Sequence, residues 1–200
     1  MNKKIVHDAL VLMAFSLVLG AILGAVYQIT LPVITQSEYE KTQEAYKAVF
    51  ADAESFEELE YDVAAAEAMM ASAGLNDTID NVQKALIGGE VAGYVVTVTA
   101  KDGSQGSITL SVGVRNDGTV NSYAITSIAE TPGLGMKAEE PEFIAQFEGK
   151  NVSSFVVVKT TPTADNEIEA IAGSTITTEA VANAVNAAIL YSQSLVGGAQ

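Results

Sequence analysis

The chain has no cysteine and a single histidine, His7, among its 200 residues. Without thiols it cannot ligate an iron–sulfur cluster, attach a c-type haem or form a disulfide. Because the histidine precedes a long apolar segment, the rest of the chain has no residue for Ser-His-Asp hydrolysis, histidine general-base catalysis or a histidine-rich zinc site. We therefore predict no catalytic side chain and no metal site, and any redox chemistry has to come from an organic cofactor.

Positive charge is also scarce, with 10 lysine and arginine residues against 25 aspartate and glutamate residues and a formal net charge of −15. A surface of that sign repels phosphate backbones, which argues against nucleic-acid binding. Solubility is the simplest explanation of the acidic surface, and attraction of cations is the alternative. With 48% hydrophobic residues, the chain can bury one sizeable core.

Charges are absent from residues 9–27, near the N-terminus. At about 1.5 Å of rise per residue, this segment forms a helix about 28 Å long, close to the hydrocarbon thickness of a bilayer. We predict a transmembrane helix over residues 9–31, ended by Pro32. Because two lysines precede it, residues 1–8 are expected in the cytoplasm and the C-terminal domain outside, in a single-pass protein of the cytoplasmic (inner) membrane.

A cleaved signal peptide is the alternative interpretation of this segment. The apolar run is longer than usual for such a peptide, no clear Ala-x-Ala cleavage site follows it, and there is no cysteine for lipoprotein processing. A retained anchor is therefore favoured. Ser16, Gly20 and Gly24 are spaced four apart, which either lets another membrane helix approach closely or reflects chance small residues on a lipid-facing surface.

Residues 32–75 are expected to form a helical connecting region. Residues 36–50 mix charged and apolar side chains as in a helix, and residues 52–73 are acidic and rich in alanine, which also predicts a helix. A break is predicted at residues 76–80, after which the hydrophobic pattern changes to a period of two.

Residues 76–200 are predicted to form the functional domain. Alternating apolar side chains indicate a half-buried strand over residues 108–114, and Asn116, Asp117 and Gly118 make a strong hairpin turn because they tolerate positive φ. Further strands are predicted at residues 91–100, 120–128 and 155–159, and helices at residues 141–147 and 177–195. The last helix has one apolar face, made by Val181, Val185, Ala188, Ile189 and Leu195. Separate runs of strands and helices indicate an α+β fold with an antiparallel sheet and packed helices.

Two segments of this domain are not explained by secondary structure alone. The first, residues 130–137, follows a predicted strand and contains a proline and two glycines, which let a backbone approach a planar ligand closely. An ordinary strand-to-helix loop is the alternative. The second, residues 168–178, places a run of hydroxyls at the start of the closing helix. The unpaired first-turn N–H groups of a helix suit a phosphate, and the same hydroxyls equally suit helix capping.

Together the two segments resemble the FMN-binding domain shared by the G subunit of the Rnf complex and the C subunit of the sodium-pumping NADH:quinone reductase. The first motif reads Glu-Thr-Pro-Gly-Leu-Gly at residues 130–135 and is followed by Pro-Glu-Phe-Ile-Ala-Gln-Phe-Glu-Gly at residues 141–149. The second resembles the flavinylation motif Asp-x-x-(Ser/Thr)-Gly-Ala-(Thr/Ser), which reads Glu-Ala-Ile-Ala-Gly-Ser-Thr at residues 169–175. The resemblance covers most of the chain, including the anchor, and the length and spacing of the elements favour the Rnf G subunit.

The resemblance implies a covalent phosphoester between FMN and the hydroxyl of Thr175, installed by a flavin transferase that uses FAD and Mg²⁺. Glu169 replaces the usual aspartate, Ala172 replaces a hydroxyl residue and Ser174 replaces alanine. Ser174 thus offers a second hydroxyl beside the acceptor, whereas position in the motif favours Thr175. Residues 131–135 would lie against the flavin ring. The implied cofactor-binding residues are Thr175, Gly173, Ser174, Thr177, Thr178, Glu130, Thr131, Pro132, Gly133, Leu134 and Gly135.

By the same resemblance, the chain is expected to relay electrons through FMN in a membrane complex that couples electron transfer between ferredoxin and NAD⁺ to movement of Na⁺ or H⁺. Its expected partners are other membrane proteins of the complex, including a second flavoprotein subunit and iron–sulfur subunits, and the chain alone is not expected to catalyse the reaction. Three alternatives stay open. They are a C-subunit-like flavoprotein of a sodium-pumping quinone reductase, a flavoprotein of another extracytoplasmic electron-transfer chain, and a non-redox module in which the hydroxyl run only caps a helix.

Overall fold

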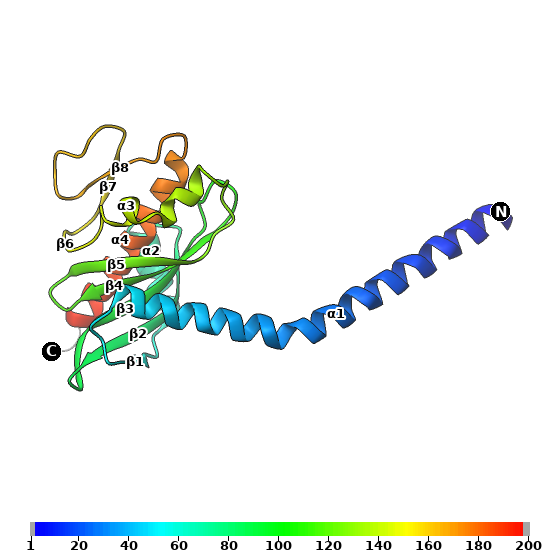
Figure 1. Cartoon of the computed structure of the whole chain (residues 1–200), viewed down its shortest axis with the longest axis horizontal. Helices are drawn as coiled ribbons and strands as arrows, with labels where there is room; N and C mark the ends of the chain where they lie inside the picture. Colours follow the sequence, from blue (N-terminus) through cyan, green and yellow to red (C-terminus); the bar gives the residue numbers. More distant parts are fainter. Residues whose placement is uncertain (1–2, 198–200) are drawn as a thin grey trace. The chain divides into compact units, whose positions relative to one another are not determined.

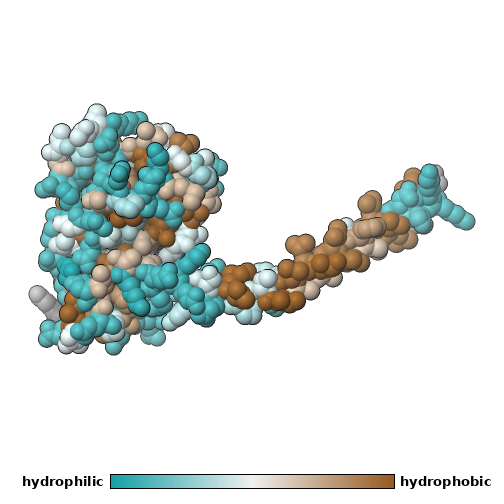
Figure 2. Space-filling model, in the orientation of Figure 1, coloured by the Kyte–Doolittle hydropathy of each residue, from teal (hydrophilic) through white to brown (hydrophobic). Residues whose placement is uncertain are grey.

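Helix α1, Lys3–Val49, forms the N-terminal part of the chain (Figure 1). The computed structural model describes residues 3–197, which divide into one compact unit up to Lys41 and a second from Thr42 onward. The predicted helix over residues 36–50 is confirmed as the C-terminal part of α1. Apolar side chains of α1 are exposed and form the long brown stretch in Figure 2. Among the described residues, α1 is the one helix long and apolar enough to cross a membrane, which is consistent with a single-pass anchor.

Pro32 lies inside α1, so the prediction that it ends the helix is wrong. A proline inside a helix removes one backbone N–H and normally kinks or breaks the hydrogen-bond ladder. Two threonines add side-chain bonds to the ladder in this region. The Thr30 hydroxyl donates to the Val26 carbonyl at 3.0 Å, and the Thr35 hydroxyl donates to the Leu31 carbonyl at 3.0 Å. The helix-forming sequence on both sides therefore propagates through the proline.

A six-stranded antiparallel sheet forms the body of the second unit (Figure 1). Its strands lie in chain order: β1 (Ser55–Glu58), β2 (Thr78–Ile87), β3 (Glu90–Ala100), β4 (Ile108–Arg115), β5 (Thr119–Ser127) and β6 (Lys150–Asn151). A separate pair of parallel strands is formed by β7 (Val156–Val158) and β8 (Glu167–Glu169). The helices of this unit are α2 (Val63–Ser72), the 3₁₀ helix η1 (Gly135–Glu139), α3 (Pro141–Ile144) and α4 (Thr175–Gly197). The predicted α+β fold with an antiparallel sheet is confirmed.

The prediction of a helix over residues 52–73 is wrong for its first half. Residues 55–58 form the edge strand β1, which pairs with β2, and only the later residues form α2. The local composition favours a helix. The outer edge of β2, however, has backbone N–H and C=O groups that need hydrogen-bond partners, and residues 55–58 supply these partners as a strand. Strand β2 itself begins at Thr78, inside the segment predicted as a break.

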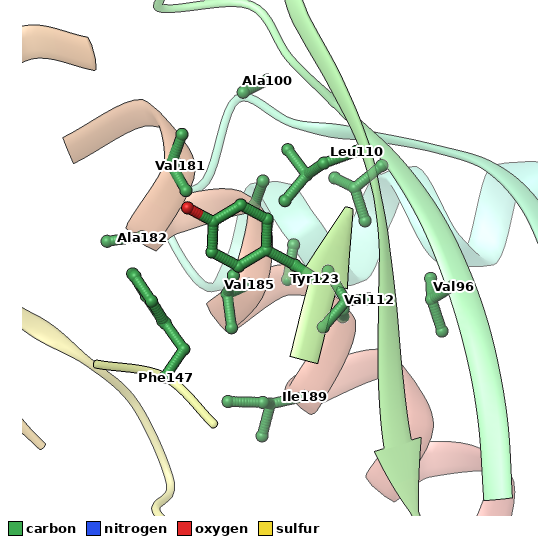
Figure 3. Packing of buried hydrophobic residues seen from close by; sticks show 14 of the residues in the cluster. Val96, Ala100, Leu110, Val112, Tyr123, Phe147, Val181, Ala182, Val185 and Ile189 are labelled. Atoms are coloured by element: carbon green, nitrogen blue, oxygen red, sulfur yellow. The ribbon is translucent and has the colours of Figure 1, made fainter. Parts of the chain in front are cut away.

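Helix α4 packs across one face of the sheet, and the main core lies between them (Figure 3). The predicted apolar face of α4 is confirmed, because four of its five residues are fully buried and Leu195 packs against the same cluster. The sheet contributes Leu110, Val112 and Tyr123. The Tyr123 ring meets the Phe147 ring edge-to-face, with 5.2 Å between centroids. This aromatic contact joins β5 to the segment that follows α3.

The opposite face of the sheet is covered by the last turns of α1, through Tyr46 and Val49. Strand β4 is therefore buried on both faces, and the prediction of a half-buried strand is wrong. Gly113 permits the close approach, because a Cβ built on it would lie 2.4 Å from the Val49 carbonyl oxygen. Ser111 on the same strand is fully buried, and its hydroxyl pairs with the Thr97 hydroxyl at 3.0 Å.

Candidate functional site

The two motifs, residues 130–135 and 169–175, meet in the folded domain. A Cβ built on Gly173 would lie 3.5 Å from Leu134 Cδ2, which is ordinary van der Waals contact. The first motif follows β5, and the second runs from β8 to the start of α4. Segments far apart in the sequence thus form one continuous surface.

The first motif contains a tight turn with a defined geometry. The Thr131 carbonyl accepts from the Leu134 N–H at 3.1 Å, and Gly133 has φ of +75°. Proline at the second position and a positive-φ glycine at the third are the signature of a type II turn. The Met136 N–H donates to the same Thr131 carbonyl at 3.3 Å. Residues 131–134 are exposed, whereas the flanking Glu130 and Gly135 are buried.

The helix that follows this turn is anchored to the core by Tyr123. Its hydroxyl donates to the Ala138 carbonyl at 2.6 Å. Burial raises the pKa of the Tyr123 phenol well above its usual value, and the charge of Glu139 raises the pKa further, so the phenol stays protonated and keeps this bond. The turn at residues 131–134 is therefore attached to a rigid part of the domain through η1.

The second motif also contains a turn that requires glycine. Gly173 has φ of +80°, and the Ser174 N–H donates to the Ile171 carbonyl at 2.8 Å. The buried Thr178 hydroxyl bridges the two ends of this turn by hydrogen bonds. It donates to the Ser174 carbonyl at 2.9 Å and accepts from the Ile171 N–H at 3.0 Å. A phosphate contact from this hydroxyl would have to replace the bond to Ser174.

Thr175 begins α4 with a half-buried side chain. Ser174 occupies the N-cap position, because its carbonyl accepts the first helical bond, from the Thr178 N–H at 3.0 Å. Neither the Ser174 nor the Thr175 hydroxyl bonds a first-turn N–H or any other group within residues 3–197. The N–H groups at the helix start are thus not capped by a hydroxyl in this part of the chain.

The Thr177 hydroxyl is fully buried and has no hydrogen-bond partner among the described residues. Leaving such a group unpaired costs about 1–3 kcal/mol. Its position two residues after Thr175 places this unpaired hydroxyl in the first turn of α4.

Two large apolar side chains stay exposed in these motifs. Leu134 is 43% exposed and Ile176 is 56% exposed, in a domain whose other large apolar residues are mostly buried. Leu134 approaches Gly173, and Ile176 directly follows Thr175. Exposed apolar side chains that cluster in one place mark a surface suited to a ligand or a partner.

A groove of about 480 Å³ adjoins the second motif. Its walls carry more negative than positive side chains. Gln146 bonds to the backbone of Glu169, the last residue of β8. Its side-chain amide oxygen accepts from the Glu169 N–H at 2.7 Å, and its amide nitrogen donates to the Glu169 carbonyl at 3.5 Å. The groove is lined by Lys137, Glu140, Glu142, Phe143, Gln146, Pro162, Glu169, Ala170, Ile171 and Ala172.

Gln146 and Tyr123 are residues of this region that were not among the predicted site residues, whereas Lys137 ends the first predicted segment, residues 130–137. Gln146 lies within residues 141–149, which follow the first motif, and only this location could have pointed to it in the sequence. Tyr123 has the pattern of an ordinary strand residue. Among residues 3–197, no three His, Cys, Asp or Glu side chains come together to hold a metal ion.

Comparison with known proteins identifies residues 103–190 as an FMN-binding domain. The matched range contains both motifs. The chain is 34% identical to the G subunit of the proton-translocating ferredoxin:NAD(+) oxidoreductase complex of Clostridium ljungdahlii over 179 residues, covering 90% of this chain and 86% of the relative. It is 28% identical to the G subunit of the ion-translocating oxidoreductase complex of Methanosarcina acetivorans, covering 95% of each chain.

A further relative covers less of the chain. The G subunit of the Na(+)-translocating ferredoxin:NAD(+) oxidoreductase complex of Acetobacterium woodii is 43% identical over 109 residues, which are 54% of this chain and 52% of that protein. Among solved structures, the C subunit of the Na(+)-translocating NADH-quinone reductase from Parabacteroides distasonis has the same fold. The TM-score is 0.52 at 20% identity, covering 80% of this chain and 94% of that one. With the motifs adjacent and a relative matched over nearly its whole length, the chain belongs to the G-subunit family of ion-translocating ferredoxin:NAD⁺ oxidoreductase (Rnf) complexes and contains an FMN-binding domain.

Proposed function

We propose that this protein carries FMN covalently on Thr175 and passes electrons through it within the oxidoreductase complex. The observation that carries the proposal is the start of α4, where the Thr175 hydroxyl is half-exposed and pairs with no group in residues 3–197. The neighbouring Gly173 and Leu134 bring the second motif against the first. A partly exposed, unpaired hydroxyl beside an apolar, glycine-rich surface suits a phosphate-linked planar cofactor.

The residues at this helix start fit the phosphate of FMN. Uncapped first-turn N–H groups offer donors and a partial positive charge. The buried Thr177 hydroxyl lacks a partner within the described chain and would gain one from a group bound there. Ser174 adds a further hydroxyl, while Thr178 holds the turn that presents the acceptor. Gly173 has no side chain, which leaves the approach to this helix start open.

Attachment to Thr175 requires a partner enzyme, which we infer to be a flavin transferase using FAD and Mg²⁺. The Thr175 oxygen would form a bond to the FMN phosphorus of FAD, the pyrophosphate bond would break, AMP would leave and the hydroxyl proton would be released. A phosphoester keeps the cofactor on the protein when the surrounding solution holds no free FMN. It also removes the association cost from every turnover.

The turn at residues 131–135 is proposed to lie against the flavin ring. Thr131, Pro132, Gly133 and Leu134 are exposed there, and the Leu134 side chain offers an apolar contact. The bound FMN would supply the redox chemistry, and the protein residues would orient and shield it. No side chain of this chain is required as an acid or a base.

The orientation of the anchor is also a proposal. With Lys3 and Lys4 at the cytoplasmic end of α1, the FMN-binding domain lies outside the cytoplasm. There the protein exchanges electrons with a second flavoprotein subunit and with iron–sulfur subunits of the complex, which links the reaction of ferredoxin and NAD⁺ to movement of Na⁺ or H⁺. Protease accessibility of the domain in sealed vesicles of known orientation tests this arrangement.

Flavin fluorescence on a denaturing gel tests the covalent site. The full chain, produced together with a flavin transferase, is expected to stay fluorescent after denaturation, and Thr175→Ala is expected to lose all of the signal. Ser174→Ala is the matched control and is expected to keep it. Loss of the signal in Ser174→Ala with retention in Thr175→Ala would move the attachment by one residue, and a dark wild-type protein would refute covalent FMN altogether.

A further inference from the structure

Glu130 is buried between two loops that are distant in the sequence. Only 6% of the residue is exposed. Its Oε1 atom accepts from the Gln105 N–H at 3.1 Å, in the loop that joins β3 to β4. Glu130 itself begins the turn proposed to contact the flavin. The carboxylate therefore links residues 101–107 to residues 131–135.

Two glycines close around this carboxylate. A Cβ built on Gly135 would lie 2.7 Å from Glu130 Cβ and 2.8 Å from Oε2, so the backbone of the turn rests directly on the side chain. A Cβ built on Gly103 would lie 3.2 Å from Glu130 Oε1 and 2.1 Å from the Gly106 carbonyl oxygen. Neither position accepts a larger residue without a shift. The carboxylate thus fills a space bounded by backbone on both sides.

The loop at residues 101–107 is also held at its other end. The Asn76 side-chain amide donates to Asp102 Oδ1 at 3.1 Å, which ties the loop to the segment before β2. The loop is therefore an attachment point for Glu130 that belongs to the body of the sheet.

We propose that Glu130 is a positioning residue that fixes the turn at residues 131–135 in place before flavin binds. It acts through Gly135 and Gln105 rather than by touching the flavin. This makes the β3–β4 loop part of the flavin site although it contains neither motif. A turn that is already ordered loses less entropy when it covers the flavin ring, so the ring is held in one orientation. The flavin part of the proposal rests on the proposed function, whereas the positioning of the turn does not.

Three variants of Glu130 separate the effect of side-chain length from the effect of the negative charge. Glu130→Gln keeps an oxygen that can accept from the Gln105 N–H and removes the charge. Glu130→Asp keeps the charge but is one methylene shorter, so it withdraws from Gln105. Glu130→Ala removes both. Glu139→Ala, on the exposed surface of η1, is the control that removes a carboxylate without a hydrogen bond or ion pair to residues 101–107 or 131–135.

Amide hydrogen exchange of the full chain in detergent tests the positioning without any flavin. In Glu130→Asp and Glu130→Ala, we expect exchange about tenfold faster at Gln105 and at Leu134 and Met136, the two amides bonded to the Thr131 carbonyl. Glu130→Gln and Glu139→Ala are expected to exchange like the wild type. The proposal is overturned if exchange at Leu134 and Met136 stays at the wild-type rate in both Glu130→Asp and Glu130→Ala. If Glu130→Ala does not fold, Glu130→Asp alone decides the outcome.

The flavin-loaded protein provides the second readout. Time-resolved fluorescence anisotropy is expected to show faster local motion of the flavin in Glu130→Asp than in wild type, and no change in Glu130→Gln. Unchanged flavin motion in Glu130→Asp contradicts the proposal. A wild-type protein that takes up no flavin contradicts the proposed function instead, while the exchange result still tests the positioning.

Discussion

Replacing Asp77 by asparagine is expected to stabilise the domain at neutral pH. Asp77 directly precedes β2, only 8% of the residue is exposed, and its Oδ2 atom has no hydrogen-bond partner among residues 3–197. The pKa of Asp77 is raised from 3.8 to about 6; burial is the largest cause, the neighbouring Asp102 carboxylate also raises the pKa, and Lys101 lowers it. The folded protein thus holds an ionised carboxylate in an unfavourable place at pH 7.

The size of the effect follows from the pKa difference between the folded and the unfolded chain. Between about pH 4 and pH 6 the unfolded chain releases the Asp77 proton while the folded chain retains it, so the folded state loses stability as the pH rises through this window. A difference of about two pKa units corresponds to about 3 kcal/mol. Because Asp102 is exposed and solvent screens its charge, we expect a net cost of about 1–3 kcal/mol above pH 7.

Urea unfolding of the full chain in detergent, followed by circular dichroism, measures this cost. Asp77→Asn is expected to exceed the wild type by about 1–3 kcal/mol in free energy of unfolding at pH 7.5, and the difference is expected to shrink at pH 5. Asp165→Asn is the control, because the Asp165 side chain is 89% exposed, and it should bring no such gain. An Asp77→Asn protein that is no more stable than wild type at pH 7.5, or equally more stable at both pH values, refutes the reasoning.

Three further substitutions test the packing and the helix start. Gly113→Ala places a Cβ 2.4 Å from the Val49 carbonyl oxygen. We expect this clash to lower the free energy of unfolding by about 1–3 kcal/mol or to release the end of α1 from the sheet. Proteolysis after Val49 detects the release. Thr178→Val removes the hydroxyl that ties the turn at residues 171–174 and is expected to destabilise the domain by about 1–3 kcal/mol in urea unfolding and to slow flavin attachment. Thr177→Val removes a buried hydroxyl that has no partner in residues 3–197 and is expected to leave the flavin-free domain as stable as the wild type or slightly more stable. Equal losses of stability in Thr177→Val and Thr178→Val contradict this assignment.

Local signals in the sequence predicted several elements correctly. The hairpin turn at residues 116–118 lies between β4 and β5, and Gly118 has φ of +88°. The apolar face of α4 is buried as its spacing predicts. These features depend on neighbouring residues alone, through the conformations that glycine allows and the spacing that buries one face of a helix.

The errors arise where a distant segment overrides the local preference. Residues 55–58 belong to an acidic segment with helical character, and β2 recruits them as an edge strand. Strand β4 shows a two-faced pattern, yet the end of α1 covers its second face. Neither outcome can be read from a window of neighbouring residues, because each depends on which segment packs against which. Pro32 is a separate case: it lies in an exposed stretch of α1, and the helix continues past it through the helix-forming residues on both sides.

The sequence by itself determined the apolar N-terminal helix, the α+β class and the two motifs, including a threonine hydroxyl at the start of the last helix. Composition, periodicity and backbone preference are properties of short stretches of sequence, and they are the same in the folded and the unfolded chain. Only the tertiary structure decided that Leu134 lies against Gly173, that Thr178 holds its turn while the Thr177 hydroxyl is left without a partner in the described chain, and that Glu130 joins the β3–β4 loop to the first motif. These arrangements join residues through space, and the path of the whole sheet sets the distances between them.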